Sequence, residues 1–161
     1  EGKGKTTAAL GLALRASGRG LPVYIGQFMK GQDYGEIHSL PRLKTVTHVQ
    51  YGDPGWVYKG KITEAQRALA REGLNQGQAA LHSGEYAIVI LDEINMAIWF
   101  ELISLEDVLE MIDNRPPEVE LVLTGRRADP AVLERADLVT EMREVKHYYT
   151  QGVPARKGIE N

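Results

Sequence analysis

The stretch Gly2-Lys3-Gly4-Lys5-Thr6-Thr7 stands directly before an Ala/Leu-rich segment with helical character. Closely spaced glycines let backbone N–H groups turn towards an anion, and the N-terminus of the following helix adds about half a positive charge. The Lys5 ammonium can reach phosphate oxygens, and the Thr6 hydroxyl is placed to bind Mg²⁺. The pattern therefore predicts a phosphate-binding loop (P-loop). The alternative is a Gly/Lys-rich surface turn.

A second stretch, Ile88-Val-Ile-Leu-Asp92-Glu93, supports this interpretation. A continuous apolar run that ends in two carboxylates indicates a buried strand with acids at its carboxyl end. In P-loop folds, an acidic side chain at this position meets Mg²⁺ and its waters. We therefore expect Glu93 and Thr6 to bind the metal, with Asp92 as a further candidate. Ordinary solvated acids at a strand end are the alternative.

Around these two motifs, short apolar runs alternate with helical patterns. Such alternation predicts βαβ crossovers and a mostly parallel sheet, so the fold class is α/β. With the P-loop, it predicts a three-layer P-loop NTPase (RecA-like) fold. The first strand of that sheet, and the leading P-loop glycine, are expected upstream of residue 1. The expected strands are 21–28, 44–51, 86–91, 119–123 and 138–142, and the expected helices are 6–16, 63–82, 104–115 and 129–136.

Composition limits the classes of protein. The 161 residues predict a single domain, 1–161, that is N-terminally incomplete. The absence of cysteine excludes disulfides and thiolate metal sites. A net charge of −3 argues against a protein that coats nucleic acid, and no apolar run approaches the length of a membrane span. No signal peptide precedes the first motif, so a cytoplasmic location is expected.

Two further regions carry candidate site residues. Arg126 follows an expected strand end in Thr124-Gly-Arg126 and could bind a triphosphate, although a surface arginine is the alternative. The Gly/Pro-broken loop Tyr51–Gly60 holds three aromatic side chains that no core-facing periodicity explains. Loop aromatics often contact a planar ligand or a partner, and packing onto the core is the alternative. The four histidines show no metal-ligand spacing.

With these residues in view, the chain resembles the ATP:corrinoid adenosyltransferases of the cob(I)alamin type that have the P-loop fold. The resemblance runs nearly end to end, and its most specific segments are Gln27-Phe-Met-Lys-Gly31 and the closing Gly158-Ile-Glu160. The other matching segments are Gly2–Ala9, Ala13–Ala16, Leu91–Glu93, Thr124–Arg126, Ala136–Met142, Lys146-His147 and Gly152–Ala155.

The resemblance implies transfer of the 5′-deoxyadenosyl group of ATP to a corrinoid reduced to Co(I), with release of triphosphate. It implies ATP, Mg²⁺ (or Mn²⁺) and the corrinoid as ligands, a flavoprotein reductant that supplies Co(I), and a homodimer. Cobalamin, cobinamide and cobyrinic acid a,c-diamide all remain open as acceptors. Neither nucleic acid nor a membrane is expected as a partner.

The resemblance also implies roles for individual residues. An aromatic side chain of the loop is expected at the lower face of the corrinoid, where it displaces the lower axial ligand of cobalt. The catalytic residues are expected to be Lys5, Glu93 and Arg126; the ATP-binding residues Gly2, Lys3, Gly4, Lys5, Thr6, Thr7 and Arg15; the corrinoid-binding residues Gly55, Trp56 and Tyr58; and the metal-binding residues Thr6, Glu93 and Asp92.

Two other functions remain open at this point. A RecA-like ATPase acting on nucleic acid would need a basic stripe, against which the net charge of −3 counts. A non-catalytic carrier of a nucleotide or corrinoid would not need Lys5, Thr6 and Glu93 together.

Overall fold

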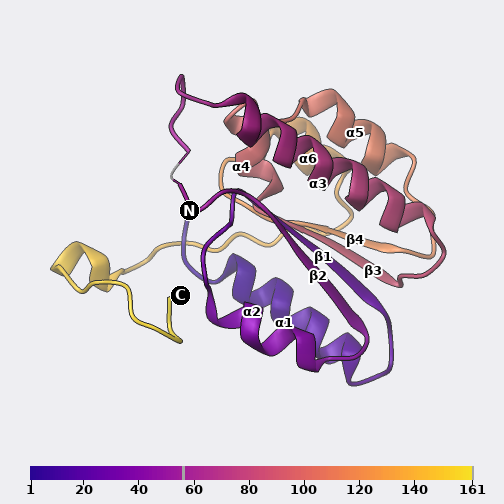
Figure 1. Cartoon of the computed structure of the whole chain (residues 1–161), viewed down its shortest axis with the longest axis horizontal. Coiled ribbons are helices and arrows are strands. Elements are labelled where there is room, and N and C mark those ends of the chain that lie inside the picture. Colours follow the sequence, from indigo (N-terminus) through magenta and orange to yellow (C-terminus); the bar gives the residue numbers. More distant parts are fainter. Residues whose placement is uncertain (56, 161) are drawn as a thin grey trace.

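A computed structural model describes residues 1–55 and 57–160, and its centre is a four-stranded sheet (Figure 1). The strands are β1 (Val23–Phe28), β2 (Val46–Tyr51), β3 (Ile88–Asp92) and β4 (Glu120–Leu123), in the order β2-β1-β3-β4. All neighbouring strands are parallel. The helices are α1 (Lys5–Ser17), α2 (Gly35–Ser39), α3 (Glu64–His82), α4 (Ile94–Trp99), α5 (Leu105–Asp113) and α6 (Pro130–Arg135), with short 3₁₀ helices at Leu40–Arg42 and Tyr148–Gln151.

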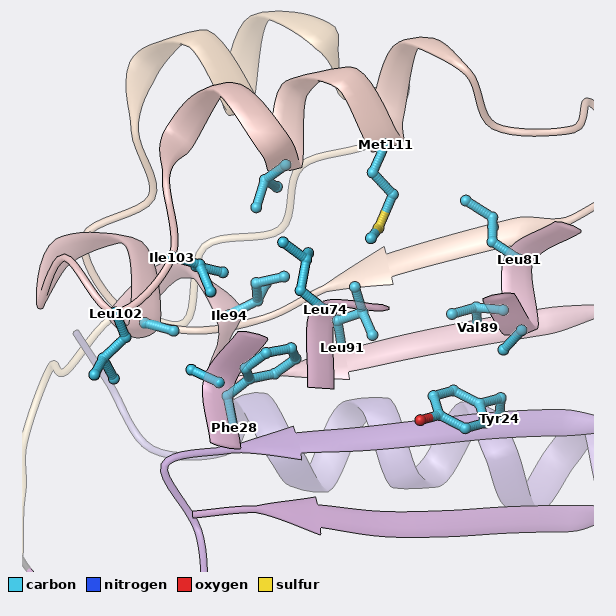
Figure 2. Close-up of a cluster of buried hydrophobic side chains, with 14 of the residues drawn as sticks. Tyr24, Phe28, Leu74, Leu81, Val89, Leu91, Ile94, Leu102, Ile103 and Met111 are labelled. Carbon is cyan, nitrogen blue, oxygen red and sulfur yellow. The ribbon is translucent and has the colours of Figure 1, made fainter. Parts of the chain in front are cut away.

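Helices cover both faces of the sheet, so the fold has the three layers expected of an α/β P-loop protein. On one face, α3, α4 and α5 pack over Phe28, Val89 and Leu91 (Figure 2). On the other face, the alanines of α1 pack against Ile25 and Ile90. Both central strands, β1 and β3, are buried along their whole length, as the continuous apolar run of β3 predicts.

Three of the four expected helix starts are confirmed by their caps. The Thr63 side chain accepts a hydrogen bond from the backbone N–H of Gln66, whose own side chain completes the capping box. Ser104 caps α5, and Asp129 caps α6 with Pro130 in the first turn. The sequence is sufficient to predict these helix starts, because a cap is formed by residues within one turn of the helix.

The expected strand at 138–142 is wrong, because this segment forms no strand. Residues 120–125 and 136–140 both line a cavity of about 430 Å³, so the segment faces open space rather than pairing with β4. It therefore has no neighbouring strand with which to form a ladder of hydrogen bonds, and Leu138 is 83% exposed. The short helices α2 and α4 are also not expected from the sequence.

The carboxyl ends of the strands meet the start of α1 at one edge of the sheet. Gln27 and Asp92 are paired in register at this edge, and Thr124 follows β4 directly. The loops after β1 and β2 touch there, because a Cβ at Gly52 would overlap the backbone nitrogen of Lys30. The fold thus gathers polar residues from distant parts of the sequence. No helix in the described ranges is long and apolar enough to cross a membrane.

Candidate functional site

The predicted P-loop forms the N-terminus of α1. Gly4 precedes the helix with a φ of 108°, a left-handed conformation that glycine adopts without strain. The Lys5 ammonium donates a hydrogen bond to the carbonyl oxygen of Gly2 at 2.7 Å, so the lysine folds over its own loop. Burial lowers the pKa of Lys5, and the nearby Arg126 guanidinium lowers it further. This end of α1 therefore concentrates positive charge, as phosphate binding requires.

The P-loop and the acidic strand end are joined directly, although 86 positions separate Thr6 from Asp92 in the sequence. The Thr6 hydroxyl lies 3.0 Å and 3.1 Å from the two carboxylate oxygens of Asp92. Thr124 donates a further hydrogen bond to Asp92 Oδ1 at 2.6 Å. The structure thus brings together two of the three predicted metal-binding residues.

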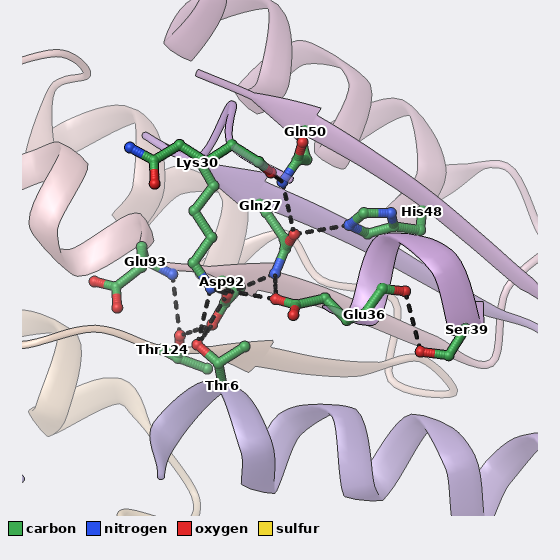
Figure 3. A network of polar contacts seen from close by, with 11 residues as sticks. Thr6, Gln27, Lys30, Glu36, Ser39, His48, Gln50, Asp92, Glu93 and Thr124 are labelled. Atoms are coloured by element: carbon green, nitrogen blue, oxygen red, sulfur yellow. Dashed lines mark hydrogen bonds and ion pairs between the residues drawn. The ribbon is translucent and has the colours of Figure 1, made fainter. Parts of the chain in front are cut away.

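Asp92 is almost fully buried and is surrounded by hydrogen-bond donors (Figure 3). Its Oδ2 accepts hydrogen bonds from Gln27 Nε2 at 3.2 Å and from the Lys30 ammonium at 2.8 Å. Burial alone would raise the pKa of this carboxyl group. The Lys30 charge and the hydrogen bonds from Lys30, Thr124 and Thr6 outweigh burial, so the pKa of Asp92 lies below its ordinary value.

Glu93 differs from its neighbour in conformation and in the direction of its pKa shift. Its φ of 63° turns the chain from β3 into α4, and its backbone N–H donates to the Thr124 hydroxyl at 3.0 Å. Figure 3 shows its carboxylate outside the hydrogen-bonded cluster around Asp92. Burial raises the pKa of Glu93, and the charge of Asp92 raises it further. Glu93 is therefore a strained, partly buried acid that lacks the compensating contacts of Asp92.

The other residues expected to bind ATP are distributed unevenly. Arg126 lies beside the P-loop, where its Nε donates to the carbonyl oxygen of Glu1 at 3.1 Å. Lys3 points to the C-terminal segment and donates to Tyr148 and Glu160, each at 2.8 Å. Arg15 is exposed in the last turn of α1. Its position ten residues along the helix places it about 15 Å from Lys5 on the axis, so it does not join the cluster of phosphate-binding candidates.

The aromatic loop lies at the same edge of the sheet, but its predicted role is not tested by the geometry. Tyr58 is 62% exposed and Gly55 is exposed. The prediction for Trp56 falls outside the described residues. The loop is fixed near its start, where Gln32 donates to the carbonyl oxygen of Pro54 at 3.3 Å.

Lys30 and Gln27 are the residues of this site whose roles the sequence did not reveal. Gln27 is fully buried in β1, and its amide also donates to Glu36 at 3.2 Å, while its oxygen is 2.8 Å from His48 Nε2. Burial lowers the pKa of His48. The sequence did contain a signal, because a glutamine inside an apolar strand and a lysine just beyond it are expensive to bury without partners.

The oxygen atoms of Thr6 and Asp92 suit a hard divalent cation better than a soft one. The Thr6 hydroxyl and the Asp92 carboxylate are oxygen ligands, which Mg²⁺ prefers, and phosphate oxygens and waters usually complete its shell. Within residues 1–55 and 57–160, no three His, Asp or Glu side chains converge on one point to form a cage for a metal.

Comparison with known proteins identifies the family of this chain. The family model of the ATP:corrinoid adenosyltransferases BtuR/CobO/CobP matches residues 1–161. The chain is 34% identical to the corrinoid adenosyltransferase of Pseudomonas aeruginosa over 99% of this chain and 79% of that protein. It is 35% identical to the corrinoid adenosyltransferase of Escherichia coli K12 and 34% identical to corrinoid adenosyltransferase CobA of Salmonella typhimurium. Both of these alignments cover 99% of this chain and 81% of the relative.

These matches do not favour the alternative of a RecA-like ATPase that acts on nucleic acid. They cover the P-loop, the acidic strand end and the C-terminal segment together, as the alignment over nearly the whole chain requires. The chain belongs to the ATP:corrinoid adenosyltransferase family.

Proposed function

We propose that the cluster around Thr6 and Asp92 holds the triphosphate of ATP while Co(I) of a reduced corrinoid attacks the ribose C5′ carbon. The Co–C5′ bond forms as the C5′–O bond breaks, and triphosphate leaves with the electron pair of that bond. Cobalt goes formally from Co(I) to Co(III). The observation that carries this proposal is the contact of 3.0 Å between the Thr6 hydroxyl and the Asp92 carboxylate at the head of α1.

The protein contributes binding and charge stabilisation rather than a nucleophile, because the reduced metal of the substrate is the nucleophile. Lys5 and the backbone N–H groups at the head of α1 are proposed to bind the triphosphate, whose negative charge rises as it leaves. Arg126 is proposed to add positive charge, since it already lowers the pKa of Lys5. Arg15 is proposed to contact the nucleoside end of ATP.

Mg²⁺ is proposed to bind Thr6 and the acidic pair Asp92 and Glu93, where it would neutralise phosphate charge. Two observations support this assignment. The oxygens of Thr6 and Asp92 already lie within hydrogen-bond distance of one another. The raised pKa of Glu93 indicates a carboxylate that a nearby cation would stabilise.

Gly55, Trp56 and Tyr58 are proposed to contact the corrinoid, with one aromatic side chain displacing the lower axial ligand of cobalt. Support comes from the exposure of Tyr58, which leaves its ring available for a flat apolar contact. We also propose a flavoprotein as the source of the electron that gives Co(I), a homodimer, and a cytoplasmic reaction. Cobalamin, cobinamide and cobyrinic acid a,c-diamide are all candidate acceptors.

The test is anaerobic incubation with ATP, Mg²⁺ and chemically reduced cobalamin, followed by the absorbance of light-sensitive adenosylcobalamin. Lys5→Met should lower the rate by about 100-fold or more, because it removes a charge that stabilises the leaving triphosphate. Lys44→Met is the matched control, because Lys44 is exposed and precedes the amino end of β2, at the edge of the sheet opposite the P-loop. A near-normal rate for Lys5→Met, or equal losses in the two variants, would overturn the role of the P-loop.

A further inference from the structure

Lys30 contacts two of the three residues that the proposed metal would use, Thr6 and Asp92. Its ammonium lies 2.8 Å from Asp92 Oδ2 and 3.1 Å from the Thr6 hydroxyl. A side-chain cation thus sits between the P-loop and the acidic strand end, where the proposed function requires a divalent cation. The role inferred for Lys30 rests on that proposed function.

The carboxylate of Asp92 has no acceptor position to spare while Lys30 is bound to it. A carboxylate offers about four lone-pair positions. Here Thr124 donates to Oδ1, Gln27 and Lys30 donate to Oδ2, and the single Thr6 hydroxyl hydrogen is shared between the two oxygens. A metal that binds Asp92 directly must therefore displace at least one of these donors.

Lys30 is the donor that can leave. Gln27 is fixed in the buried strand β1 and is also bound to Glu36 and His48. Thr124 is buried and accepts the backbone N–H of Glu93. Lys30, by contrast, lies beyond the end of β1 on a flexible four-carbon stem.

A second binding position for the Lys30 ammonium lies close by, beside Glu36 and Tyr34. Glu36 Oε1 lies 3.9 Å from its nitrogen, and the ring of Tyr34 is centred 5.4 Å away. Both groups favour a cation, and both lie on the side of the following helix α2 rather than on the P-loop. A short movement would keep Lys30 paired while exposing Asp92 and Thr6.

The backbone around Lys30 is fixed, so this movement is confined to the side chain. A Cβ at Gly31 would overlap the carbonyl oxygen of Gly52, and a Cβ at Gly52 would overlap the backbone of Lys30. The two loops are therefore packed backbone to backbone. This packing places the Lys30 backbone where its side chain reaches Asp92.

We propose that Lys30 is a built-in counter-cation that occupies the metal position of Asp92 and Thr6 and exchanges with the incoming Mg²⁺. In the proposed exchange, the Lys30 ammonium neutralises the buried Asp92 carboxylate until Mg²⁺ binds in its place. The two cations exclude each other, because a divalent ion and an ammonium on the same carboxylate oxygen repel strongly at this distance.

The proposal predicts tighter metal binding when the Lys30 charge is removed. Mn²⁺ serves as the probe, and its free concentration is measured by electron paramagnetic resonance in the absence of ATP and corrinoid. Lys30→Met should bind Mn²⁺ at least about tenfold more tightly than the unmodified chain, because a competing charge is gone. Lys30→Arg, which keeps the charge, and the exposed control Lys44→Met should bind Mn²⁺ as the unmodified chain does.

The double variant Lys30→Met/Asp92→Asn shows whether the tighter Mn²⁺ binding of Lys30→Met depends on Asp92. It should lose the tight Mn²⁺ binding, because the carboxylate that Lys30 occupies has been removed. Equal Mn²⁺ affinity in Lys30→Met and the unmodified chain would overturn the proposal, as would a gain that persists in the double variant. Since no step uses the corrinoid, failure of adenosyl transfer leaves this result unaffected and the two proposals are tested separately.

A crystal structure of the unmodified chain with Mg²⁺ and ATP tests the proposal even where Lys30→Met does not fold. The Lys30 nitrogen is expected beyond hydrogen-bond distance of Asp92, with the metal in its place. Retention of the Lys30–Asp92 contact beside a bound Mg²⁺ would overturn the proposal.

Discussion

The pKa values of two adjacent carboxyl groups at the end of β3 are shifted in opposite directions, although the sequence shows only a pair of acids. Asp92 is held by hydrogen bonds and by Lys30, and its pKa is lowered. Glu93 is partly buried, its carboxylate lies outside the hydrogen-bonded cluster, and its pKa is raised. A shift in pKa is also a statement about stability, because the folded chain favours one charge state over the other.

This contrast predicts opposite effects of two conservative substitutions. Asp92→Asn should lower the midpoint of thermal unfolding at pH 7 by about 5 °C or more, because it removes one half of a buried ion pair. Glu93→Gln should raise it by about 2–4 °C, the shift that about 1 kcal/mol produces in a domain of this size. Calorimetry without ligands measures both midpoints.

The pH dependence has opposite signs at the two positions. The contribution of Asp92 is fully present above the ordinary carboxyl pKa of about 4 and is lost as the pH falls through its lowered pKa. The ionised Glu93 side chain lowers the stability of the fold, and this effect is fully present above its raised pKa and disappears at lower pH. The rise in the unfolding midpoint caused by Glu93→Gln should therefore become smaller on acidification. Destabilisation by Glu93→Gln at pH 7 would contradict this assignment.

At the scale of single elements, the sequence predicts what local chemistry determines. The capping residues Thr63, Ser104 and Asp129 define their helix starts within one turn, and the β-branched run of β3 identifies a strand buried on both faces. The apolar pattern of 138–142 is misleading because a strand exists only with a partner beside it. The contacts of Lys30 and Gln27 could not be predicted, since they depend on which strand ends lie next to one another.

Helix α3 packs on the sheet through glycines, which leads to a matched pair of predictions. A Cβ at Gly73 would lie 2.7 Å from the ring of Tyr51, whereas a Cβ at Gly11 in α1 meets nothing within 4 Å. Gly73→Ala should lower the free energy of unfolding by about 1–3 kcal/mol through overpacking. Gly11→Ala should raise it by up to about 1 kcal/mol, because alanine favours a helix.

Urea denaturation of the two alanine variants measures both changes. The Tyr51 ring cannot move aside easily, because its hydroxyl is 2.7 Å from that of Tyr24. Equal effects of the two substitutions would show that α3 does not rest on Tyr51 as described.

At the scale of the whole molecule, exposed apolar side chains concentrate in the C-terminal part of the chain. Leu138, Val145 and Tyr149 are 83%, 91% and 73% exposed. Large apolar side chains exposed to this extent are candidates for an interface, and they support the proposed homodimer.

A homodimer through this surface predicts a specific failure. Leu138→Glu and Val145→Glu should each shift the chain from dimer to monomer in sedimentation velocity, because a charge would be buried in the interface. Leu14→Glu is the control, since Leu14 is 60% exposed on α1 and lies outside the C-terminal part of the chain. A dimer that survives both C-terminal substitutions would place the interface elsewhere.

The P-loop of this chain is proposed to hold a leaving group rather than to deliver a phosphoryl group, and this is the central claim. The most direct test is ³¹P nuclear magnetic resonance of the products formed from ATP, Mg²⁺ and chemically reduced cobalamin under anaerobic conditions. We predict inorganic triphosphate in amounts equal to the adenosylcobalamin formed. ADP and phosphate without triphosphate would contradict the claim.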